Sequence, residues 1–174
     1  MTGGRKAIII TASVLAVIVA AIVVMRSFVF EIVIIKGQSM KNTIRPGDHV
    51  VLNKQAYRSR EPKRGDLVAF KLEPYRVLIK RVIGIPGDII EVKNGVPYRN
   101  GEEIVNEPYV TFHPVDQKRN SCRPRTVQHR HLFVMGDNRA TSVDSKDFGP
   151  ITYEEVIGKV SFIYYPPRRI ARFP

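Results

Sequence analysis

Residues 7–25 form an apolar stretch without a charge, and this stretch limits the possible folds more than any other segment. Nineteen residues in a helix extend about 28 Å, enough to span the hydrocarbon core of a bilayer. Arg5 and Lys6 precede the stretch, and Arg26 follows it. These features predict a transmembrane helix over 7–25 with residues 1–6 on the cytoplasmic side. The alternatives are a buried core helix and a cleaved signal peptide, whose apolar region is normally about 7–15 residues long.

The remaining residues, 26–174, are enough for one soluble domain. The chain has 28 Lys and Arg against 16 Asp and Glu, which gives a formal net charge of +12. This excess suits an anionic membrane surface, and it would also suit nucleic acid. Cys122 is the only cysteine, so an intrachain disulfide is excluded, and a cysteine-based zinc site is disfavoured.

Short apolar segments separated by turn residues predict a mainly β domain. The Asn94-Gly95 dipeptide lies between two such segments and predicts a hairpin. Residues 112–131 are rich in Arg, Lys, His, Pro and Gln, and they look like a solvated insertion. The main predicted strands are 28–35, 49–52, 67–70, 76–85, 132–135 and 156–165.

Lys80 lies inside an apolar segment of a predicted strand, 77–83. Because alternate strand residues face opposite sides, Lys80 and Arg81 point in opposite directions, and both faces are mainly apolar. At least one of these two cations should therefore be buried. Burial lowers the pKa of a lysine, so that its neutral amine can act as a base at physiological pH. The alternative is a lysine on a half-exposed strand whose amine reaches the solvent.

Ser39 follows Gly37 and Gln38 in a predicted loop. A glycine at this position lets a substrate backbone approach closely, and the Ser39 N–H could donate to an oxyanion. The alternative is an ordinary turn serine. Together, Ser39 and Lys80 suggest a serine hydrolase with a Ser-Lys dyad.

Residues 136–148 form a polar loop that gathers Asp137, Ser142, Asp144 and Lys146. Side chains of this kind commonly satisfy the backbone of a turn, which is the alternative to a role in the site.

Four motifs in this order resemble those of bacterial type I signal peptidases, or leader peptidases. Residues 37–44, followed by Pro-Gly-Asp, look like the family's Ser-Met-x-Pro-Thr-Leu box. Residues 65–70 are similar to its second conserved segment, 79–88 to its lysine box and 136–149 to its C-terminal box. Each motif alone is moderately specific, whereas four in order behind an apolar stretch are highly specific. The small size and single apolar stretch look more like Gram-positive members.

The resemblance implies a membrane-anchored serine endopeptidase that removes N-terminal signal peptides from exported preproteins. Small residues would be preferred at the −1 and −3 positions of the substrate. Ser39 would be the nucleophile and Lys80 the general base, with Ser142 orienting the lysine amine. Asp144 and Lys146 would shape the site through a salt bridge, with Lys146 where the family often has Arg. The supporting residues are Ser142, Asp144, Lys146 and Met40 of the first motif.

The resemblance also implies a signal-peptidase-like, mainly β fold over residues 26–174. A catalytic β core would carry a smaller, variable insertion at about 89–131. This domain would lie outside the cytoplasm, attached to the cell membrane by a single helix. The partners would be secretory preproteins and the lipid bilayer, with no nucleic acid, metal or cofactor. The resemblance does not specify an oligomeric state.

Three residues depart from the family's first motif. Asn42 stands where the family usually has Pro, so the loop after Ser39 should be less rigid. Ile44 replaces Leu, which is a mild change. Gly37 stands where some members carry a serine that donates to the oxyanion, so stabilisation would rest on backbone donors or water. The departures leave the reaction class intact and bear on its rate.

Two other functions fit parts of the sequence. A Ser-Lys peptidase with another target, such as a repressor that cleaves itself, would usually carry a helical DNA-binding domain where this chain has its apolar stretch. A non-catalytic, membrane-tethered binding module would draw support from the basic cluster at 118–130, and it would not depend on Ser39 or Lys80.

Overall fold

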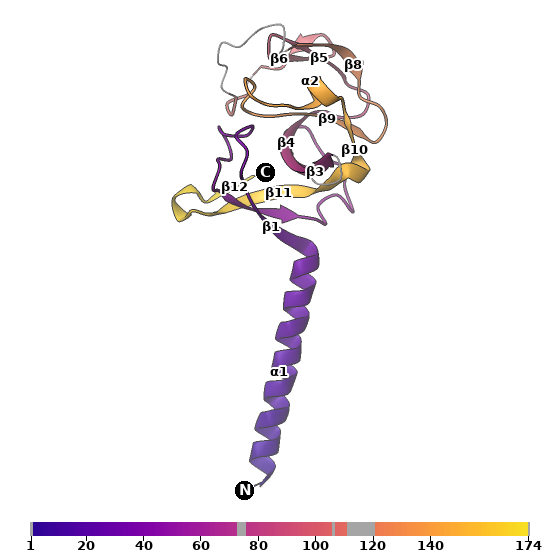
Figure 1. Ribbon diagram of the computed structural model, residues 1–174. Coiled ribbons are helices and arrows are strands. Elements are labelled where there is room, and N and C mark those ends of the chain that lie inside the picture. Colours follow the sequence, from indigo (N-terminus) through magenta and orange to yellow (C-terminus); the bar gives the residue numbers. More distant parts are fainter. Residues whose placement is uncertain (1, 73–75, 106, 111–120, 174) are drawn as a thin grey trace.

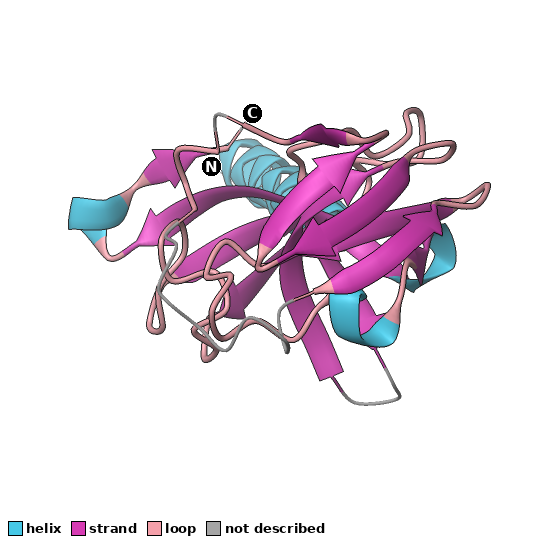
Figure 2. Ribbon diagram, turned by 90° about the horizontal axis from the view of Figure 1, so that it is seen from above, coloured by secondary structure: helices cyan, strands magenta, loops and turns pink. Residues whose placement is uncertain are grey.

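The computed structural model describes residues 2–72, 76–105, 107–110 and 121–173. A long N-terminal helix, α1, leads into a domain built from two antiparallel sheets (Figure 1). Strands are the main regular structure of the domain (Figure 2), so the predicted mainly β fold is confirmed. The elements in chain order are α1 (Thr2–Val29), β1 (Phe30–Ile34), β2 (His49–Asn53), β3 (Leu67–Leu72), β4 (Arg76–Gly84), β5 (Ile89–Lys93), β6 (Val96–Arg99), β7 (Glu102–Glu103), β8 (Cys122–Thr126), β9 (His131–Met135), α2 (Ser145–Phe148), β10 (Ile151–Thr152), η2 (Tyr153–Glu155), β11 (Val156–Tyr165), η3 (Pro167–Arg169) and β12 (Ala171–Arg172).

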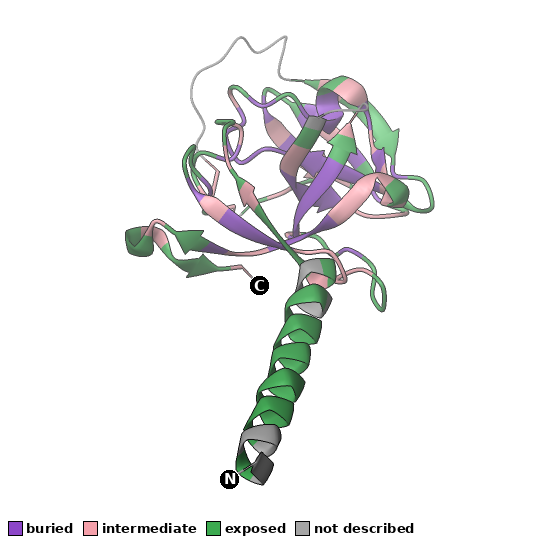
Figure 3. Ribbon diagram, turned by 60° about the horizontal axis from the view of Figure 1, so that its bottom comes forward, coloured by how far each residue is buried: buried purple, intermediate pink, exposed green. Residues whose placement is uncertain are grey.

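The helix α1 is longer than the predicted stretch 7–25 and ends at Val29, so the first strand begins at Phe30 rather than at residue 28. The residues after β2 stabilise this helix end, because the Lys54 N–H donates to the Val29 carbonyl oxygen at 2.9 Å. The side chains of residues 8–24, the central part of α1, are all exposed (Figure 3). Within the part of the chain that the structure describes, no helix meets the length and apolarity needed to cross a membrane.

The larger sheet has the strand order β1-β2-β11-β3-β4-β9-β10, and β12 pairs with β11. The strand β4 lies inside this sheet, between β3 and β9. Both faces of β4 are covered, since Ile79 packs against one hydrophobic cluster and Leu78 and Val82 pack against another. The two buried cations in the middle of β4, Lys80 and Arg81, must therefore find partners inside the protein.

The smaller sheet has the order β7-β6-β5-β8 and lies at the end of the domain away from α1 (Figure 1). Asn94 and Gly95 join β5 to β6 with φ angles of 52° and 85°, so the predicted Asn-Gly hairpin is confirmed. Within the predicted solvated insertion 112–131, Cys122–Thr126 forms β8 and pairs with β5, while four of its five residues are exposed. The β8 backbone pairs with β5, and the Cys122 side chain packs against a hydrophobic cluster of the core. Residues 112–120 lie outside the described residues.

Three hydrophobic clusters form the core, and they contact the Ser39 turn, β4 and the strand before the 136–148 loop. The first includes Met40 and Ile44, so it holds the segment that follows Ser39. The second is formed mainly by side chains of β3, β4 and β9. The third joins Ile90 of the smaller sheet to Phe133 and Met135 of β9, which leads directly into residue 136. The core therefore brings the Ser39 loop, β4 and the 136–148 loop together.

Candidate active site

Lys80 is buried in the middle of β4, with 2% of its surface exposed. It lies opposite Val68 of β3, and its Nζ donates a hydrogen bond to Ser142 Oγ at 3.0 Å. The pKa of Lys80 is lowered to about 8, mainly by burial; the Asp144 carboxylate opposes this shift, and the nearby Lys146 cation adds to it. A substantial fraction of Lys80 is therefore neutral near physiological pH and able to accept a proton.

Ser39 lies in a turn that leads from β1 into the core. Met40 is buried, and its sulfur accepts a hydrogen bond from the Asp137 N–H at 3.4 Å. The Ser39 carbonyl oxygen accepts from the Asn138 N–H at 2.9 Å, and the Asn138 side chain donates to the Gln38 carbonyl oxygen. The turn is thus held against residues 137–138. Among the described residues, neither the N–H nor the hydroxyl of Ser39 has a hydrogen-bond partner, so both are available to a substrate.

Gly136 lies where Ser39 and Ser142 approach each other. A Cβ atom at this position would stand 2.6 Å from the Ser39 carbonyl oxygen and 2.7 Å from Ser142 Cβ. Only glycine leaves room for this approach. Because Ser142 also holds the Lys80 amine, Gly136 brings the backbone of Ser39 next to the partner of Lys80.

Asp144 and Lys146 lie at the start of α2 and form an ion pair, with 3.4 Å between Lys146 Nζ and an Asp144 carboxylate oxygen. The other Asp144 oxygen accepts from the Gly136 N–H at 3.1 Å. Lys146 Nζ also donates to the Ser142 carbonyl oxygen. This pair therefore holds the backbone on both sides of the close approach at Gly136.

Arg81 and Asp137 are a buried pair whose contact the sequence analysis did not identify. Arg81 Nε and Nη2 donate to the two Asp137 carboxylate oxygens at 2.9 and 2.7 Å. Asn42 donates to the Asp137 carbonyl oxygen at 3.0 Å, so the residue that replaces the family's Pro fastens the Ser39 turn to the same loop. The adjacent cations in β4 were the available signal, since both Lys80 and Arg81 turn out to be buried.

An apolar groove of about 300 Å³ opens beside Ser39. Its walls come from the end of β1, from the first part of β4 and from the Ser39 turn, including Ile35, Ile79 and Met40. The strand β1 pairs only with β2, so its other edge is unpaired among the described strands. The groove thus combines an apolar lining, a candidate nucleophile and a strand edge.

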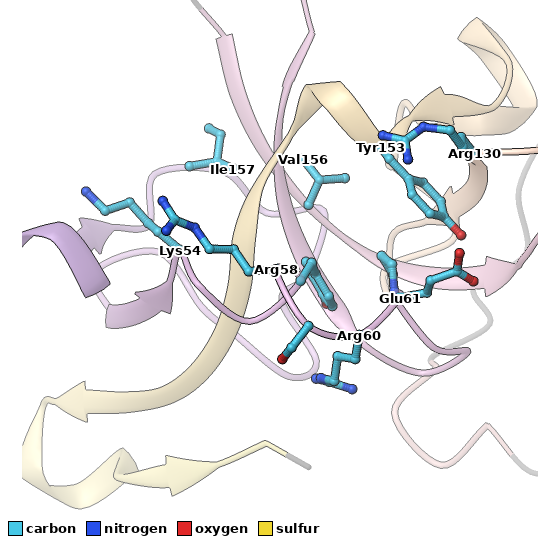
Figure 4. A pocket seen from close by; sticks show the side chains of 11 residues that line it. Lys54, Arg58, Arg60, Glu61, Arg130, Tyr153, Val156 and Ile157 are labelled. Atoms are coloured by element: carbon cyan, nitrogen blue, oxygen red, sulfur yellow. The ribbon is translucent and has the colours of Figure 1, made fainter.

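A second cavity, of about 410 Å³, lies between residues 54–62, Arg130 and the start of β11 (Figure 4). It shares no lining residue with the groove at Ser39. Arg130 lies beside the Tyr153 ring and pairs with Glu154 at 2.6 Å, and Arg60 lies 3.6 Å from Asp66. Two of the cations that line this cavity, Arg130 and Arg60, are therefore paired with carboxylates of the protein itself. The cavity is separate from the candidate active site.

Residues 7–165 match the family model described as signal peptidase, peptidase S26. This match places the chain in a class of enzymes, the serine hydrolases that cleave peptide bonds. The chain belongs to the signal peptidase family, as the four motifs predicted.

Curated relatives agree with this membership. Signal peptidase I of Bacillus caldolyticus is 35% identical over 167 residues, which cover 89% of this chain and 90% of the relative. Signal peptidase IB of Staphylococcus aureus strain COL is 32% identical over 166 residues, covering 87% of this chain and 86% of the relative. The signal peptidase I of Enterococcus faecalis V583, known from a crystal structure, has 28% sequence identity to this chain. The superposition has a TM-score of 0.43 and covers 59% of this chain and 98% of the Enterococcus faecalis chain.

Proposed function

We propose that this protein removes signal peptides from exported preproteins, with Ser39 as nucleophile and Lys80 as general base. The observation that carries the proposal is the buried Lys80 amine, held by Ser142 beside the Ser39 turn. Its pKa of about 8 suits a base that works near neutral pH. Ser39 and Lys80 are not hydrogen-bonded to each other here, and such contacts often tighten only when a substrate binds.

The reaction proceeds through an acyl-enzyme. Neutral Lys80 takes the proton from Ser39 Oγ as this oxygen attacks the carbonyl carbon of the scissile bond. The Ser39 N–H donates to the oxyanion that forms. Lys80 then passes its proton to the leaving amine, and the signal peptide stays on Ser39 as an ester. A water that loses its proton to Lys80 hydrolyses the ester, and Lys80 returns this proton to the departing Ser39 Oγ, which restores the serine and the neutral amine.

We place the substrate in the apolar groove. An extended peptide could pair with the unpaired edge of β1, a recognition mode that supplies affinity through main-chain hydrogen bonds. Its alternate side chains would then face the aliphatic lining contributed by Ile35 and Ile79. This aliphatic lining suits the small, uncharged side chains expected at −1 and −3.

Cleavage of a purified preprotein tests this function. We expect a single cut after a small-x-small segment, located by mass spectrometry of both products. A preprotein with a bulky residue at −1 is the matched control, and its cleavage should fall about 100-fold or more because the side chain would clash with the lining of the groove. Equal cleavage of both substrates, or a cut elsewhere, would contradict the proposed specificity.

We further propose that α1 holds the protein in the membrane, with the domain outside the cytoplasm. The uncharged stretch 7–25 and the exposed aliphatic side chains of α1, such as Leu15 and Val19, support this placement. The full chain should stay with membranes during alkaline carbonate extraction. A variant with Leu15→Arg and Val19→Arg should be released, because each central arginine opposes insertion by about 2.5–3.5 kcal/mol. Release of the wild-type chain would contradict the anchor.

The pH dependence of cleavage follows from Lys80. Only the neutral amine accepts a proton, so activity should be lost as the pH falls below the Lys80 pKa of about 8. At one unit below this pKa, about one tenth of the maximal rate should remain. A kcat/KM profile from pH 6 to 10 checks the prediction, with an acid-side midpoint expected near 8. A midpoint between 4 and 6 would indicate a carboxylate or histidine base instead.

A further inference from the structure

The segment 107–110, which lies between β7 and β8 of the smaller sheet in the chain, touches the polar loop of the candidate site. Glu107 accepts a hydrogen bond from Arg139 Nη2 at 2.7 Å. The two side chains are almost fully buried, with 5% of Glu107 and 1% of Arg139 exposed. The contact joins residues 32 positions apart in the chain, so it ties the segment 107–110 to the 136–142 loop.

Arg139 transmits this contact to the backbone of the site. Its Nε donates to the Gly136 carbonyl oxygen at 3.0 Å, while the Gly136 N–H donates to Asp144. Both polar groups of Gly136 are therefore held by charged side chains. Gly136 in turn lies against Ser39 and Ser142, so a rotation of its peptide planes would move the two serines.

The segment makes a second contact through Tyr109, whose hydroxyl donates to the same Glu107 oxygen at 3.4 Å. The Arg81 guanidinium lies over the Tyr109 ring, 3.6 Å from the ring centre. Arg81 also holds the carboxylate of Asp137, the residue next to Gly136. Two side chains from one short turn thus act on two cations that fasten the 136–142 loop.

The pairing of Glu107 with Arg139 is incomplete, which argues against a purely stabilising role. Glu107 Oε2 and Arg139 Nη1 are buried and have no hydrogen-bond partner among the described residues. A buried ion pair with unpaired atoms gives less stability than well-packed apolar side chains of similar volume. What the pair does supply is a fixed direction for the Arg139 Nε–H toward Gly136.

We infer that Glu107 is a positioning residue, which acts through Arg139 to set the Gly136 peptide and, with it, the placement of Ser39 and Ser142. This inference rests on the proposed roles of Ser39 and Lys80. It gives the segment 107–110 of the smaller sheet a part in the reaction, although no residue of that segment lines the groove at Ser39.

The test compares full-length wild type with Glu107→Gln, which keeps the shape of the side chain and removes its charge. Glu102→Gln is the matched control, because Glu102 is exposed on β7 in the same part of the chain. We expect Glu107→Gln to lower kcat about tenfold while KM changes less than twofold, since the groove is intact. The acid-side midpoint of the pH profile should rise, because a loosened Ser142 lets water reach the Lys80 amine.

A readout independent of cleavage separates this inference from the proposed function. Hydrogen exchange at the Asp137 amide, which shares a peptide plane with the Gly136 carbonyl held by Arg139, should quicken in Glu107→Gln and stay unchanged in Glu102→Gln. If wild type cleaves no preprotein, the exchange data still decide whether Glu107 holds Gly136. The inference would be overturned if folded Glu107→Gln had the kcat, the pH midpoint and the amide exchange rate of wild type. A lower melting temperature alone, with these three quantities unchanged, would show a purely structural role and would also overturn it.

A variant that fails to fold does not end the test. In that case the double variant Glu107→Gln with Arg139→Gln removes both buried charges together, so no uncompensated charge stays inside the protein. It should fold, and it should show the same loss in kcat and the same faster exchange as expected for the single variant. Full activity of the double variant would overturn the inference.

Discussion

Ser39→Ala and Lys80→Met should each reduce preprotein cleavage by about 10⁴-fold or more, because each removes a group that takes part directly in bond formation or proton transfer. Lys80→Arg should be equally inactive, since a guanidinium keeps its proton at any pH at which the protein is folded. Lys80→Met should fold well, because it replaces a buried amine with an apolar side chain of similar length.

The controls for this experiment come from the same chain. Ser59→Ala removes an exposed serine outside the groove and should leave cleavage unchanged. Cleavage is measured by the appearance of mature protein, and folding by thermal melting. Cleavage by Lys80→Met or Lys80→Arg at a rate near that of wild type would exclude Lys80 as the base. The non-catalytic binding module predicts no cleavage by any variant, wild type included.

Gly136→Ala should reduce cleavage by about 100-fold, the cost of displacing reacting groups by about 1 Å. The added methyl group would collide with Ser142 and with the Ser39 carbonyl oxygen, which would stand 2.6 Å away. Neither neighbour is the end of a flexible chain, so the Ser39 turn and Ser142 must separate. The Ser142 hydroxyl then no longer holds the Lys80 amine in its present place.

Gly158→Ala is the matched control for this substitution. A Cβ atom on Gly158 would stand 2.6 Å from the Asn53 carbonyl oxygen, so the steric conflict is similar, but Gly158 lies on β11 and does not line the groove at Ser39. Its melting temperature should fall, whereas the cleavage rate of the folded variant should stay within about threefold of wild type. The comparison is made with kcat/KM and thermal melting for both variants. Equal rates for Gly136→Ala and wild type would show that the close approach at Gly136 has no part in the reaction.

Much of the fold follows from local sequence patterns. Alternating apolar residues and turn residues predict the strands, and the Asn94-Gly95 dipeptide predicts its hairpin because only a few residues tolerate positive φ angles. The end of α1 at Val29 was not predictable, since it depends on a hydrogen bond from Lys54. The strand Cys122–Thr126 was missed because β5 stabilises it through the backbone, which leaves little trace in side-chain type.

The site shows the same division. The position of Lys80 in an apolar strand predicts burial, and the structure places it inside the larger sheet. The partners of the buried arginines were not predictable, since Arg81 meets Asp137 and Arg139 meets Glu107 across long stretches of chain. Such pairs depend on how the strands are ordered in space, and no local pattern of residues encodes that order. Likewise, the motifs suggest roles for Ser142 and Asp144 without showing that both surround Gly136.

The most direct test of the Ser39 and Lys80 mechanism is to trap the acyl-enzyme. Wild type is mixed with a preprotein at high pH, quenched with acid within milliseconds to seconds, digested and analysed by mass spectrometry. We predict an adduct with the mass of the signal-peptide acyl group, bound as an ester to Ser39. The adduct should be absent from Ser39→Ala. An adduct on another residue, or cleavage by Ser39→Ala at the wild-type rate, would contradict the mechanism.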